Sequence, residues 1–328
     1  MRSAVAAWVA MGVVFATSGC GGKQSSLAPA SRPARDIADL WWVMLVGAFV
    51  LTGIVVMLIV IGVLRRREGP VLMVPDEPGD LRAKALILFG GVVAPVLVLS
   101  ALFGVGVHVL GATNAPAAGE AARTIEVIGH QWFWEVRYPG TAAVTANEIH
   151  IPAGVPLRLE VRTKDVIHSF WAPSLNRKID TIPGRANSIL LEAKPGVYRG
   201  QCAEFCGLQH ANMAFYVFAD PPDKFRRWLA NEAKPARAGS AGAKVFTSQG
   251  CGSCHTIRGT SATGKVGPDL THVASRTTLA ALTIPNRPGY LAGWILDPQH
   301  VKPGNKMPAL NVNGTALQHL VDYLTSLR

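Results

Sequence analysis

Two long apolar stretches constrain the fold of this chain more than any other feature. Residues 40–64 and 85–110 contain no Asp, Glu, Lys or Arg, and each is long enough for a helix to cross the roughly 30 Å hydrocarbon core of a bilayer. The basic side chains of the loop between them are Arg65, Arg66, Arg67, Arg82 and Lys84. By the positive-inside rule this loop is cytoplasmic. The sequence therefore predicts a transmembrane hairpin over 40–110, with everything after residue 110 outside the cytoplasm.

A shorter apolar run lies at the N-terminus. A basic start, an apolar run and Ser-Gly before Cys20 form the pattern of an export signal over residues 1–19. Ser-Gly-Cys also resembles a bacterial lipoprotein cleavage box, in which Cys20 becomes the lipidated new N-terminus, although Thr17 stands where that box usually has Leu. Lipidation, ordinary cleavage and an uncleaved anchor all remain open. Residues 20–39 are predicted to be an N-terminal segment ahead of the hairpin.

A loop crowded with soft metal ligands is the second constraint. Residues 202–213 have the sequence Cys-Ala-Glu-Phe-Cys-Gly-Leu-Gln-His-Ala-Asn-Met. Thiolates and a thioether favour copper, whereas a structural zinc site usually takes Cys and His alone. A mononuclear blue-copper site needs only one Cys, with two His and a distant Met. The extra thiolate is explained if Cys202 and Cys206 bridge two copper ions and His168 supplies the second imidazole; the alternative is a disulfide between the two cysteines.

This loop, together with His-Ser-Phe at 168–170, resembles the dicopper CuA site of the cytochrome c oxidase subunit 2 family. Gly-His-Gln-Trp-Phe-Trp at 129–134 and Pro-Ser-Leu at 173–175, followed by Asp-Thr-Ile-Pro-Gly-Arg at 180–185, resemble the same family in the expected order. The resemblance implies the following copper ligands: His168, Cys202, Cys206, His210, Met213 and the backbone carbonyl of Glu204.

Two further roles are implied by the resemblance. The Glu204 side chain points to a magnesium ion shared with subunit 1 in that family, and Trp132 matches an exposed indole through which electrons are accepted from cytochrome c. Without the resemblance, Trp132 is an aromatic residue of a core or its rim. Family members often carry a Glu near the entrance of a proton channel, just before the second span. This chain matches it only loosely with Asp80, so a role in proton uptake stays open.

Residues 120–232 have the pattern of an all-β domain. Short alternating runs separated by Gly and Pro are expected to be strands of a sandwich or barrel: 124–128, 148–151, 157–161, 188–192, 197–201 and 214–218. The resemblance implies a cupredoxin-like Greek key. The metal loop is then expected between the last two strands, with His168 at the end of an earlier strand, so that distant ligands meet at one rim.

A linker at 233–242, rich in Ala, Lys, Pro, Gly and Ser, separates this domain from residues 243–328. Cys251, Cys254 and His255 form a C-x-x-C-H motif, in which two thiols bond the vinyl groups of a haem and the adjacent His binds its iron. A helix-like segment precedes the motif. The sequence therefore predicts a covalent haem c in an all-α cytochrome c domain.

Two downstream segments, Gly-Pro-Asp-Leu at 267–270 and Asn-Lys-Met-Pro at 305–308, resemble the haem-packing loop and axial Met of small cytochromes c. Residues 317–327 are expected to be the closing amphipathic helix. As sixth iron ligand, Met307 has three competitors: His272, His300 and His319. A thioether raises the reduction potential relative to a second imidazole, which suits a donor to a high-potential copper site, so Met307 is favoured.

The whole pattern predicts a multidomain membrane protein with a two-helix transmembrane hairpin, an all-β cupredoxin-like domain and an all-α cytochrome c domain. The resemblance implies a subunit of a haem–copper cytochrome c oxidase with a fused cytochrome c, the caa3-type arrangement. It passes electrons from its haem to the dicopper centre and on to subunit 1, where oxygen is reduced to water. The implied partners are subunit 1, subunit 3, membrane lipid and an upstream donor such as a bc1 complex or a small cytochrome c. The implied location is the bacterial inner membrane, with both redox domains outside the cytoplasm.

Other functions were weighed against this one. The net charge of +11 suits nucleic acid, anionic lipid or an acidic partner, but no compact run of Lys and Arg is interleaved with aromatics, so nucleic acid is discounted. A dicopper subunit of a nitric oxide reductase complex uses the same centres and stays an alternative. Nitrous oxide reductase needs a further His-rich domain for which the chain leaves no room. A copper-delivery protein needs neither a haem nor two spans.

Overall fold

The computed structural model describes residues 22, 24–65, 81–114, 116, 123–236, 241–312 and 314–328. The predicted export signal at 1–19, the lipidation candidate Cys20 and the proton-channel candidate Asp80 lie outside the described residues. The chain divides into two units, Arg35–Thr113 and the remainder.

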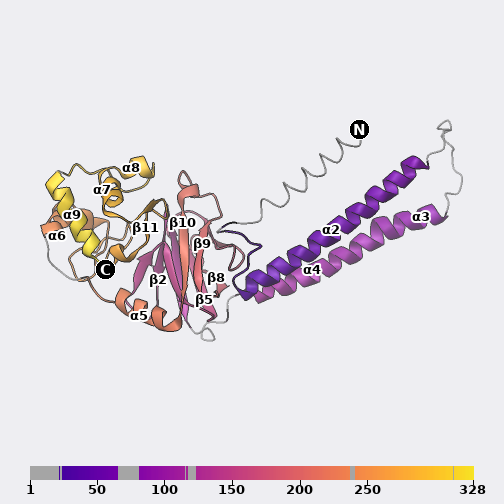
Figure 1. The fold of residues 1–328 in the computed structure, drawn as a ribbon, viewed down its shortest axis with the longest axis horizontal. Coiled ribbons are helices and arrows are strands. Elements are labelled where there is room, and N and C mark those ends of the chain that lie inside the picture. The colour runs from indigo at the N-terminus through magenta and orange to yellow at the C-terminus, as the bar shows by residue number, and fades with distance from the viewer. Residues whose placement is uncertain are drawn as a thin grey trace, which may run out of the picture. The chain divides into compact units, whose positions relative to one another are not determined.

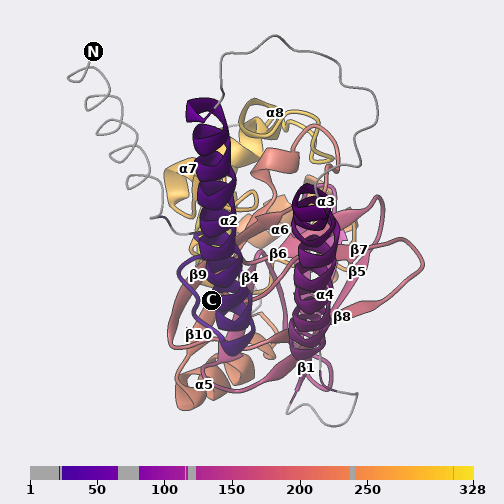
Figure 2. The same ribbon diagram turned by 90° about the vertical axis from the view of Figure 1, so that its right-hand side faces the viewer.

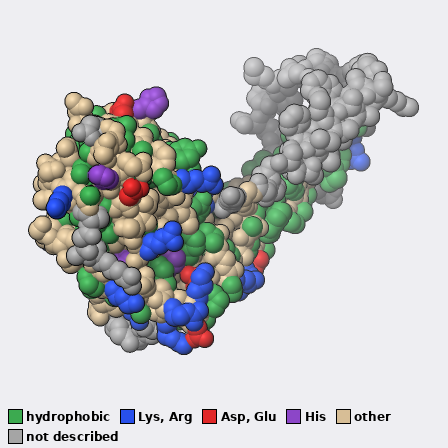
Figure 3. All heavy atoms as spheres, turned by 60° about the vertical axis from the view of Figure 1, so that its left-hand side comes forward, with side chains coloured by type: hydrophobic (Ala, Val, Ile, Leu, Met, Phe, Trp, Pro, Cys, Tyr) green, Lys and Arg blue, Asp and Glu red, His purple; other side chains and the backbone are tan. Residues whose placement is uncertain are grey.

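Two apolar helical segments make up the Arg35–Thr113 unit. They are α2 (Arg32–Leu64) and a returning segment of α3 (Leu81–Leu88), η1 (Phe89–Val93) and α4 (Ala94–Ala112) (Figures 1 and 2). Arg32–Leu64 and Lys84–Ala112 are long and apolar enough to cross a membrane, with hydropathies of 2.9 and 2.6. Hydrophobic side chains cover much of the visible part of these helices (Figure 3). The predicted hairpin is therefore present as two candidate spans.

The returning segment contains one irregular turn. A proline ring clashes with the carbonyl four residues earlier in a regular α-helix, so Pro95 disturbs the turn that contains Gly91. That turn is the π-helical η1, which ends two residues before Pro95. A wider turn of this kind lets the helix continue through a proline.

Two five-stranded sheets form the β domain, with strand orders β3-β2-β1-β5-β8 and β4-β10-β9-β6-β7 (Figure 1). The strands are β1 Thr124–His130, β2 Phe133–Arg137, β3 Val144–Ala146, β4 Glu148–Pro152, β5 Leu157–Thr163, β6 His168–Trp171, β7 Ile179–Thr181, β8 Asn187–Leu191, β9 Gly196–Cys202 and β10 Ala214–Asp220. β1 pairs in parallel with β5, and β4 with β10, while the other pairs are antiparallel. Trp134 and Phe215 are fully buried in the core between the sheets.

Each strand predicted for this domain is present, and the structure adds others. The added elements are β2, β3, β6, β7 and the helix α5 (Pro222–Glu232). β3 and β7 have only three residues each, which is too short for an alternating pattern to be recognised. The expectation that His168 ends an earlier strand is wrong, because His168 begins β6 and pairs with Thr181.

The segment before α2 packs on the β domain. The Ala30 N–H donates to the Ser174 carbonyl at 2.8 Å, and the Lys194 N–H donates to the Ala30 carbonyl at 2.9 Å. The Ser31 hydroxyl donates to the Leu175 carbonyl and accepts from the Ala34 N–H. Ser31 therefore caps the start of α2, and the Pro-Ser-Leu motif serves as the attachment point of this segment.

The C-terminal domain is mostly helical. It contains α6 Ala241–Ser248, η3 Cys251–Ser253, η4 Val273–Ser275, β11 Thr278–Leu279, β12 Ile284–Pro285, α7 Pro288–Leu296, α8 Pro298–Val301 and α9 Gly314–Ser326. α9 is the predicted closing helix, and its Tyr323 packs against Phe246 of α6. A Cβ on Gly242 would lie 2.0 Å from the His319 carbonyl oxygen. Only glycine therefore allows α6 and α9 to approach this closely.

Candidate functional site

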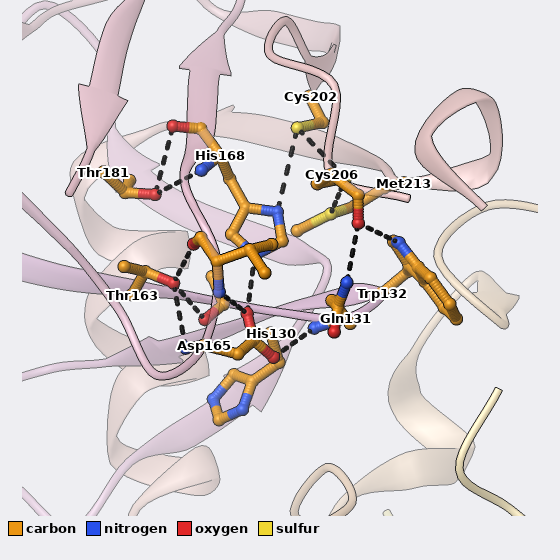
Figure 4. Close-up of polar contacts among 12 residues, drawn as sticks. His130, Gln131, Trp132, Thr163, Asp165, His168, Thr181, Cys202, Cys206 and Met213 are labelled. Carbon is orange, nitrogen blue, oxygen red and sulfur yellow. Dashed lines mark hydrogen bonds and ion pairs between the residues drawn. The ribbon is translucent and has the colours of Figure 1, made fainter. Parts of the chain in front are cut away.

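Strand pairing brings the predicted copper ligands to one rim of the β domain. β6 pairs with β9 through Phe170 and Cys202, so the strand that begins with His168 lies beside the strand that ends with Cys202. The loop from β9 to β10 carries the remaining ligands. Figure 4 shows that the side chains of His168, Cys202 and Cys206 point toward one another.

The two thiols form the centre of this cluster. Their Sγ atoms are 3.8 Å apart, and both cysteines are free, whereas a disulfide bond measures about 2.05 Å. The other predicted ligands surround them. The distances are 3.9 Å from His168 Nδ1 to Cys202 Sγ, 3.2 Å from the Glu204 carbonyl oxygen to Cys202 Sγ, 3.7 Å from His210 Nδ1 to Cys206 Sγ, and 3.8 Å from Met213 Sδ to Cys206 Sγ.

This donor set fits two soft metal ions better than one. An imidazole nitrogen lies beside each sulfur, with a carbonyl oxygen on one side and a thioether on the other. His168 and Met213 are fully buried, so water is excluded from most of the cluster. Soft sulfur ligands in a dry, asymmetric set favour copper over magnesium or calcium.

The two thiols share one proton readily. The hydrogen bond from Cys206 is the largest cause that lowers the pKa of Cys202 to about 3, and the Cys202 thiolate in turn raises the pKa of Cys206. For His168, burial lowers the pKa, but the hydrogen bonds to Asp165 and Cys202 outweigh it, so the net shift is upward. The protein therefore favours negative charge on Cys202, which is the form that binds a metal.

A second layer of contacts orients the ligands (Figure 4). Asp165 Oδ1 lies 2.8 Å from His168 Nε2, which leaves Nδ1 facing Cys202. The Gln131 amide N–H donates to Asp165 at 2.8 Å. The Gln131 side-chain amide and the Trp132 indole N–H both donate to the Cys206 carbonyl, at 2.8 and 2.9 Å. The roles of Asp165 and Gln131 were not predicted from the sequence.

Gly129 explains why the Gly-His-Gln-Trp-Phe-Trp motif begins with glycine. A Cβ at this position would lie 2.8 Å from Cδ2 of His168. The imidazole therefore packs directly on the β1 backbone. This close approach fixes the plane of the ring against the sheet.

The predicted haem ligands lie around a cavity of about 410 Å³, which is lined mainly by the C-terminal domain and on one side by the β domain. Cys251, Cys254, His255 and Met307 all line it. A cavity of this size with mainly apolar walls suits a large planar group. The fold thus brings the Cys and His residues of the C-x-x-C-H motif together with Met307, the predicted sixth ligand.

His255 is prepared as a neutral ligand. Burial lowers its pKa, and its Nδ1 lies 2.8 Å from the Pro268 carbonyl oxygen, so Nε2 is the nitrogen left for iron. A Cβ on Gly267 would lie 2.4 Å from Cε1 of His255. The Gly-Pro pair at 267–268 therefore orients the imidazole, as metal-binding histidines require.

Among the described residues, the competitors of Met307 do not line the cavity. These competitors are His272, His300 and His319. The buried His272 contacts the Lys234 carbonyl through Nε2 at 3.0 Å. Met307 does line the cavity, and its role as the sixth ligand stays a prediction.

Trp132 lies between the two sites. Its indole N–H contacts the Cys206 carbonyl, and Trp132 also lines the cavity that holds Cys251 and Met307. It is half-buried, not the exposed indole that the resemblance implies, because the C-terminal domain packs beside it. The Glu204 side chain, by contrast, is exposed.

Comparisons with known proteins agree with this arrangement. The family model described as cytochrome c oxidase subunit II, periplasmic domain, matches residues 142–219, and the cytochrome c model matches residues 239–328. The cytochrome c oxidase subunit 2 of Alkalihalophilus pseudofirmus is 36% identical over 220 residues, which cover 65% of this chain and 64% of that protein. The probable cytochrome c oxidase subunit 2 of Rickettsia bellii is 32% identical over 184 residues, covering 49% of this chain and 68% of that protein.

A solved structure is also similar to part of the chain. The crystal structure of the periplasmic domain of subunit II of cytochrome oxidase of Bradyrhizobium japonicum shares 32% identity, covers 34% of this chain and 94% of that one, and gives a TM-score of 0.34. The chain spans 62 to 64% of the length of the relatives from Alkalihalophilus pseudofirmus, Bacillus subtilis and Bacillus strain PS3.

Proposed function

This chain belongs to the cytochrome c oxidase subunit 2 family, and we propose that it is the subunit through which electrons enter a respiratory haem–copper oxidase. Electrons arrive at a haem on the C-terminal domain, pass to a dicopper centre and leave for the haems of a separate subunit 1, where oxygen is reduced to water. The cytochrome c domain in the same chain makes this a caa3-type arrangement.

The copper centre is held by the residues clustered around the two thiols. Cys202 and Cys206 would hold the two ions together with His168, His210, Met213 and the Glu204 carbonyl. A dicopper centre of this kind takes up and releases one electron at a time. Ligands held between paired strands move little when the charge changes, which suits electron transfer.

Asp165 fixes the form of His168 that binds copper. Because its carboxylate accepts a hydrogen bond from Nε2, the lone pair of the neutral ring is on Nδ1, which faces Cys202. Such outer contacts determine both the tautomer and the orientation of a metal-binding histidine. Asp165 is thus a positioning residue of the copper site.

A haem would be held by Cys251 and Cys254 through thioether bonds, and by His255 and Met307 at its iron. A low-spin haem with these ligands exchanges single electrons, and a thioether ligand favours a high potential. The neutral imidazole of His255 and the apolar cavity walls support this assignment.

One observation carries the proposal: Trp132 contacts both sites. Its side chain donates to the carbonyl of the copper ligand Cys206 and lines the haem cavity. The tether also replaces a collision between separate proteins by an effective concentration that reaches roughly the mM range for a short linker. The haem domain is thereby a resident donor for the copper site.

The surroundings complete the proposal. The two candidate spans anchor the chain in the bacterial inner membrane beside subunit 1 and subunit 3, with both redox domains outside the cytoplasm and Cys20 available for lipidation. The exposed Glu204 side chain is available for a magnesium ion shared with subunit 1. An upstream bc1 complex or a small cytochrome c supplies the electrons.

Gas consumption by the purified complex tests this function. With a reduced cytochrome as donor, the complex is expected to consume oxygen at a rate that depends on the haem domain. Removal of residues 243–328 should lower this rate but spare oxygen consumption with artificial donors. Consumption of nitric oxide in place of oxygen would contradict the proposal and support a nitric oxide reductase.

A further inference from the structure

Lys302 is a buried cation at the contact between the haem domain and the β domain. It follows α8 and is only 2% exposed. Its Nζ donates to the carbonyl oxygens of Trp132, Asn212 and Ala280 at 2.8, 2.6 and 3.0 Å.

These three carbonyls belong to different parts of the molecule. Trp132 follows β1, and Asn212 lies in the copper loop next to Met213, whereas Ala280 belongs to the haem domain. An ammonium group has three N–H donors, and all of them are used. A buried charge is costly unless its hydrogen bonds are made, so Lys302 is stable here only when all three segments are in place.

The third acceptor belongs to a strained turn. Ala280, Ala281 and Leu282 have φ values of 53°, 57° and 67°, and left-handed backbone is unfavourable for residues with a Cβ. Strain of this kind persists where the surrounding structure enforces it. The turn directs the Ala280 carbonyl to both Lys302 and the Thr283 hydroxyl, at 3.0 and 2.6 Å.

This turn also forms part of the haem cavity. Ala280, Ala281 and Lys302 line the cavity together with Trp132. The ammonium therefore connects the cavity wall to the backbone of the tryptophan whose side chain contacts Cys206. No other described lysine has three carbonyl acceptors on three separate segments in this way.

We propose that Lys302 is a positioning residue that fixes the haem domain on Trp132 and thereby sets the rate of electron transfer between the two domains. The proposal rests on the proposed function, since it concerns the path from haem to copper. Lys302 carries no electron itself. A consequence is that the haem domain covers the Trp132 surface, so a separate donor protein delivers electrons to the haem domain and not to Trp132.

Other contacts between the domains allow a Lys302 variant to fold. Glu148 Oε1 accepts from the Thr277 N–H and hydroxyl at 2.7 and 2.6 Å. The Gln209 side-chain amide donates to the Pro303 carbonyl at 2.8 Å, and Arg276 contacts Thr145. Loss of Lys302 alone therefore loosens the contact at Trp132, while the other contacts and the core of each domain remain.

The test uses the full chain in detergent with copper and haem bound. Three variants are compared with the unchanged chain: Lys302→Met, Lys302→Arg and, as a control, the exposed Lys244→Met. After rapid reduction of the haem by a flash, electron arrival at copper is followed by absorbance. Lys302→Met is expected to slow transfer by roughly 10- to 100-fold, because three carbonyls lose a charged donor. Lys302→Arg should recover part of the rate, and Lys244→Met should leave it unchanged.

Hydrogen exchange gives a second readout that does not depend on electron transfer. The Thr277 amide, which donates to Glu148 across the contact, is expected to exchange roughly 10- to 100-fold faster in Lys302→Met. The Val127 amide, within the β1–β5 ladder, should not change. Unchanged transfer and unchanged Thr277 exchange would overturn the proposal.

The remaining outcomes are also decisive. If both Lys302→Met and Lys302→Arg lose the copper or haem spectrum, Lys302 is a residue of the fold and the proposal is overturned. If the unchanged chain itself transfers no electron from haem to copper, the proposed function fails. In that case the exchange of Thr277 still decides whether Lys302 holds the domains together.

Discussion

The predicted copper ligands lie within 4 Å of a neighbouring sulfur, whereas the predicted haem ligands stand around a cavity of about 410 Å³. The first site is assembled by strand pairing and hydrogen bonds, such as those of Asp165 and Trp132. The second is assembled around a volume that the polypeptide does not fill. The two sites therefore differ in how far the protein alone determines them.

This difference follows from the size of the two groups. A copper ion occupies little volume, so the β domain closes its own core around Trp134 and Phe215. A haem is a much larger and mainly apolar group, and the core of the C-terminal domain is a small one that includes Phe246 and Leu320. Copper therefore depends on a folded β domain, whereas the C-terminal domain depends on its haem.

The largest expected effect is loss of the haem. A Cys251→Ser, Cys254→Ser double variant removes both thioether bonds, so the mainly apolar walls of the cavity lose their covalently bound group. A small domain is only marginally stable, so we expect the C-terminal domain to unfold without this group. The denatured chain should lose its haem stain, and a protease should degrade residues 243–328 while sparing the β domain. A protease-resistant C-terminal domain in this variant would contradict the comparison.

The next effect is loss of copper without loss of fold. In Cys206→Ser the hydroxyl is a hard ligand and a poor bridge, so paramagnetic resonance should no longer show one electron shared by two copper nuclei. The β domain should keep its circular dichroism, since its core does not depend on the metal. Cys251→Ser is the matched control and should leave the copper signal unchanged. A dicopper signal that survives in Cys206→Ser would show that this thiol is not a bridge.

A smaller effect is expected at the second layer of the copper site. Asp165→Asn keeps the shape but removes the charge that orients His168, so copper affinity should fall by roughly 10- to 100-fold. Competition with a chelator measures this. Asp180→Asn, at an exposed position of β7, is the control. Equal affinities of the two variants would mean that the strands alone position His168.

The smallest expected effect is a change in stability with pH that arises from Glu232. Burial raises the pKa of Glu232 to about 7 from its usual 4.5, so the native protein binds this proton more tightly than the unfolded chain. The free energy of unfolding should therefore fall as pH rises, by about 1 kcal/mol between pH 6 and 7.5. Glu232→Gln should remove this slope in urea denaturation of the full chain. A slope that is equal in both proteins would assign it to another group.

Patterns that are local in sequence were predictable. The hairpin follows from two uncharged stretches, and the ligand spacing from Cys202 to Met213 lies within one loop. Met307, which lines the cavity, is predicted as an iron ligand because it belongs to a short motif. These predictions required no knowledge of which strands pair.

Contacts between distant residues were not predictable from the pattern. Asp165 is only three residues before His168, so its spacing offered a weak signal, but the hydrogen bond from Gln131 depends on the position of β1. Lys302 reaches the carbonyl of Trp132 across 170 positions. The short strands β3 and β7 form because neighbouring strands pair with them, and no period within three residues reveals this.

Flash reduction of the haem in the dilute full chain tests the central claim most directly, because it asks whether haem and copper exchange electrons within one molecule. Copper is expected to become reduced as the haem is reoxidised, at a rate that does not change with protein concentration. Trp132→Ala should slow this step and leave copper and haem content intact. A rate that rises in proportion to protein concentration, or a haem that stays reduced beside oxidised copper, would contradict the claim.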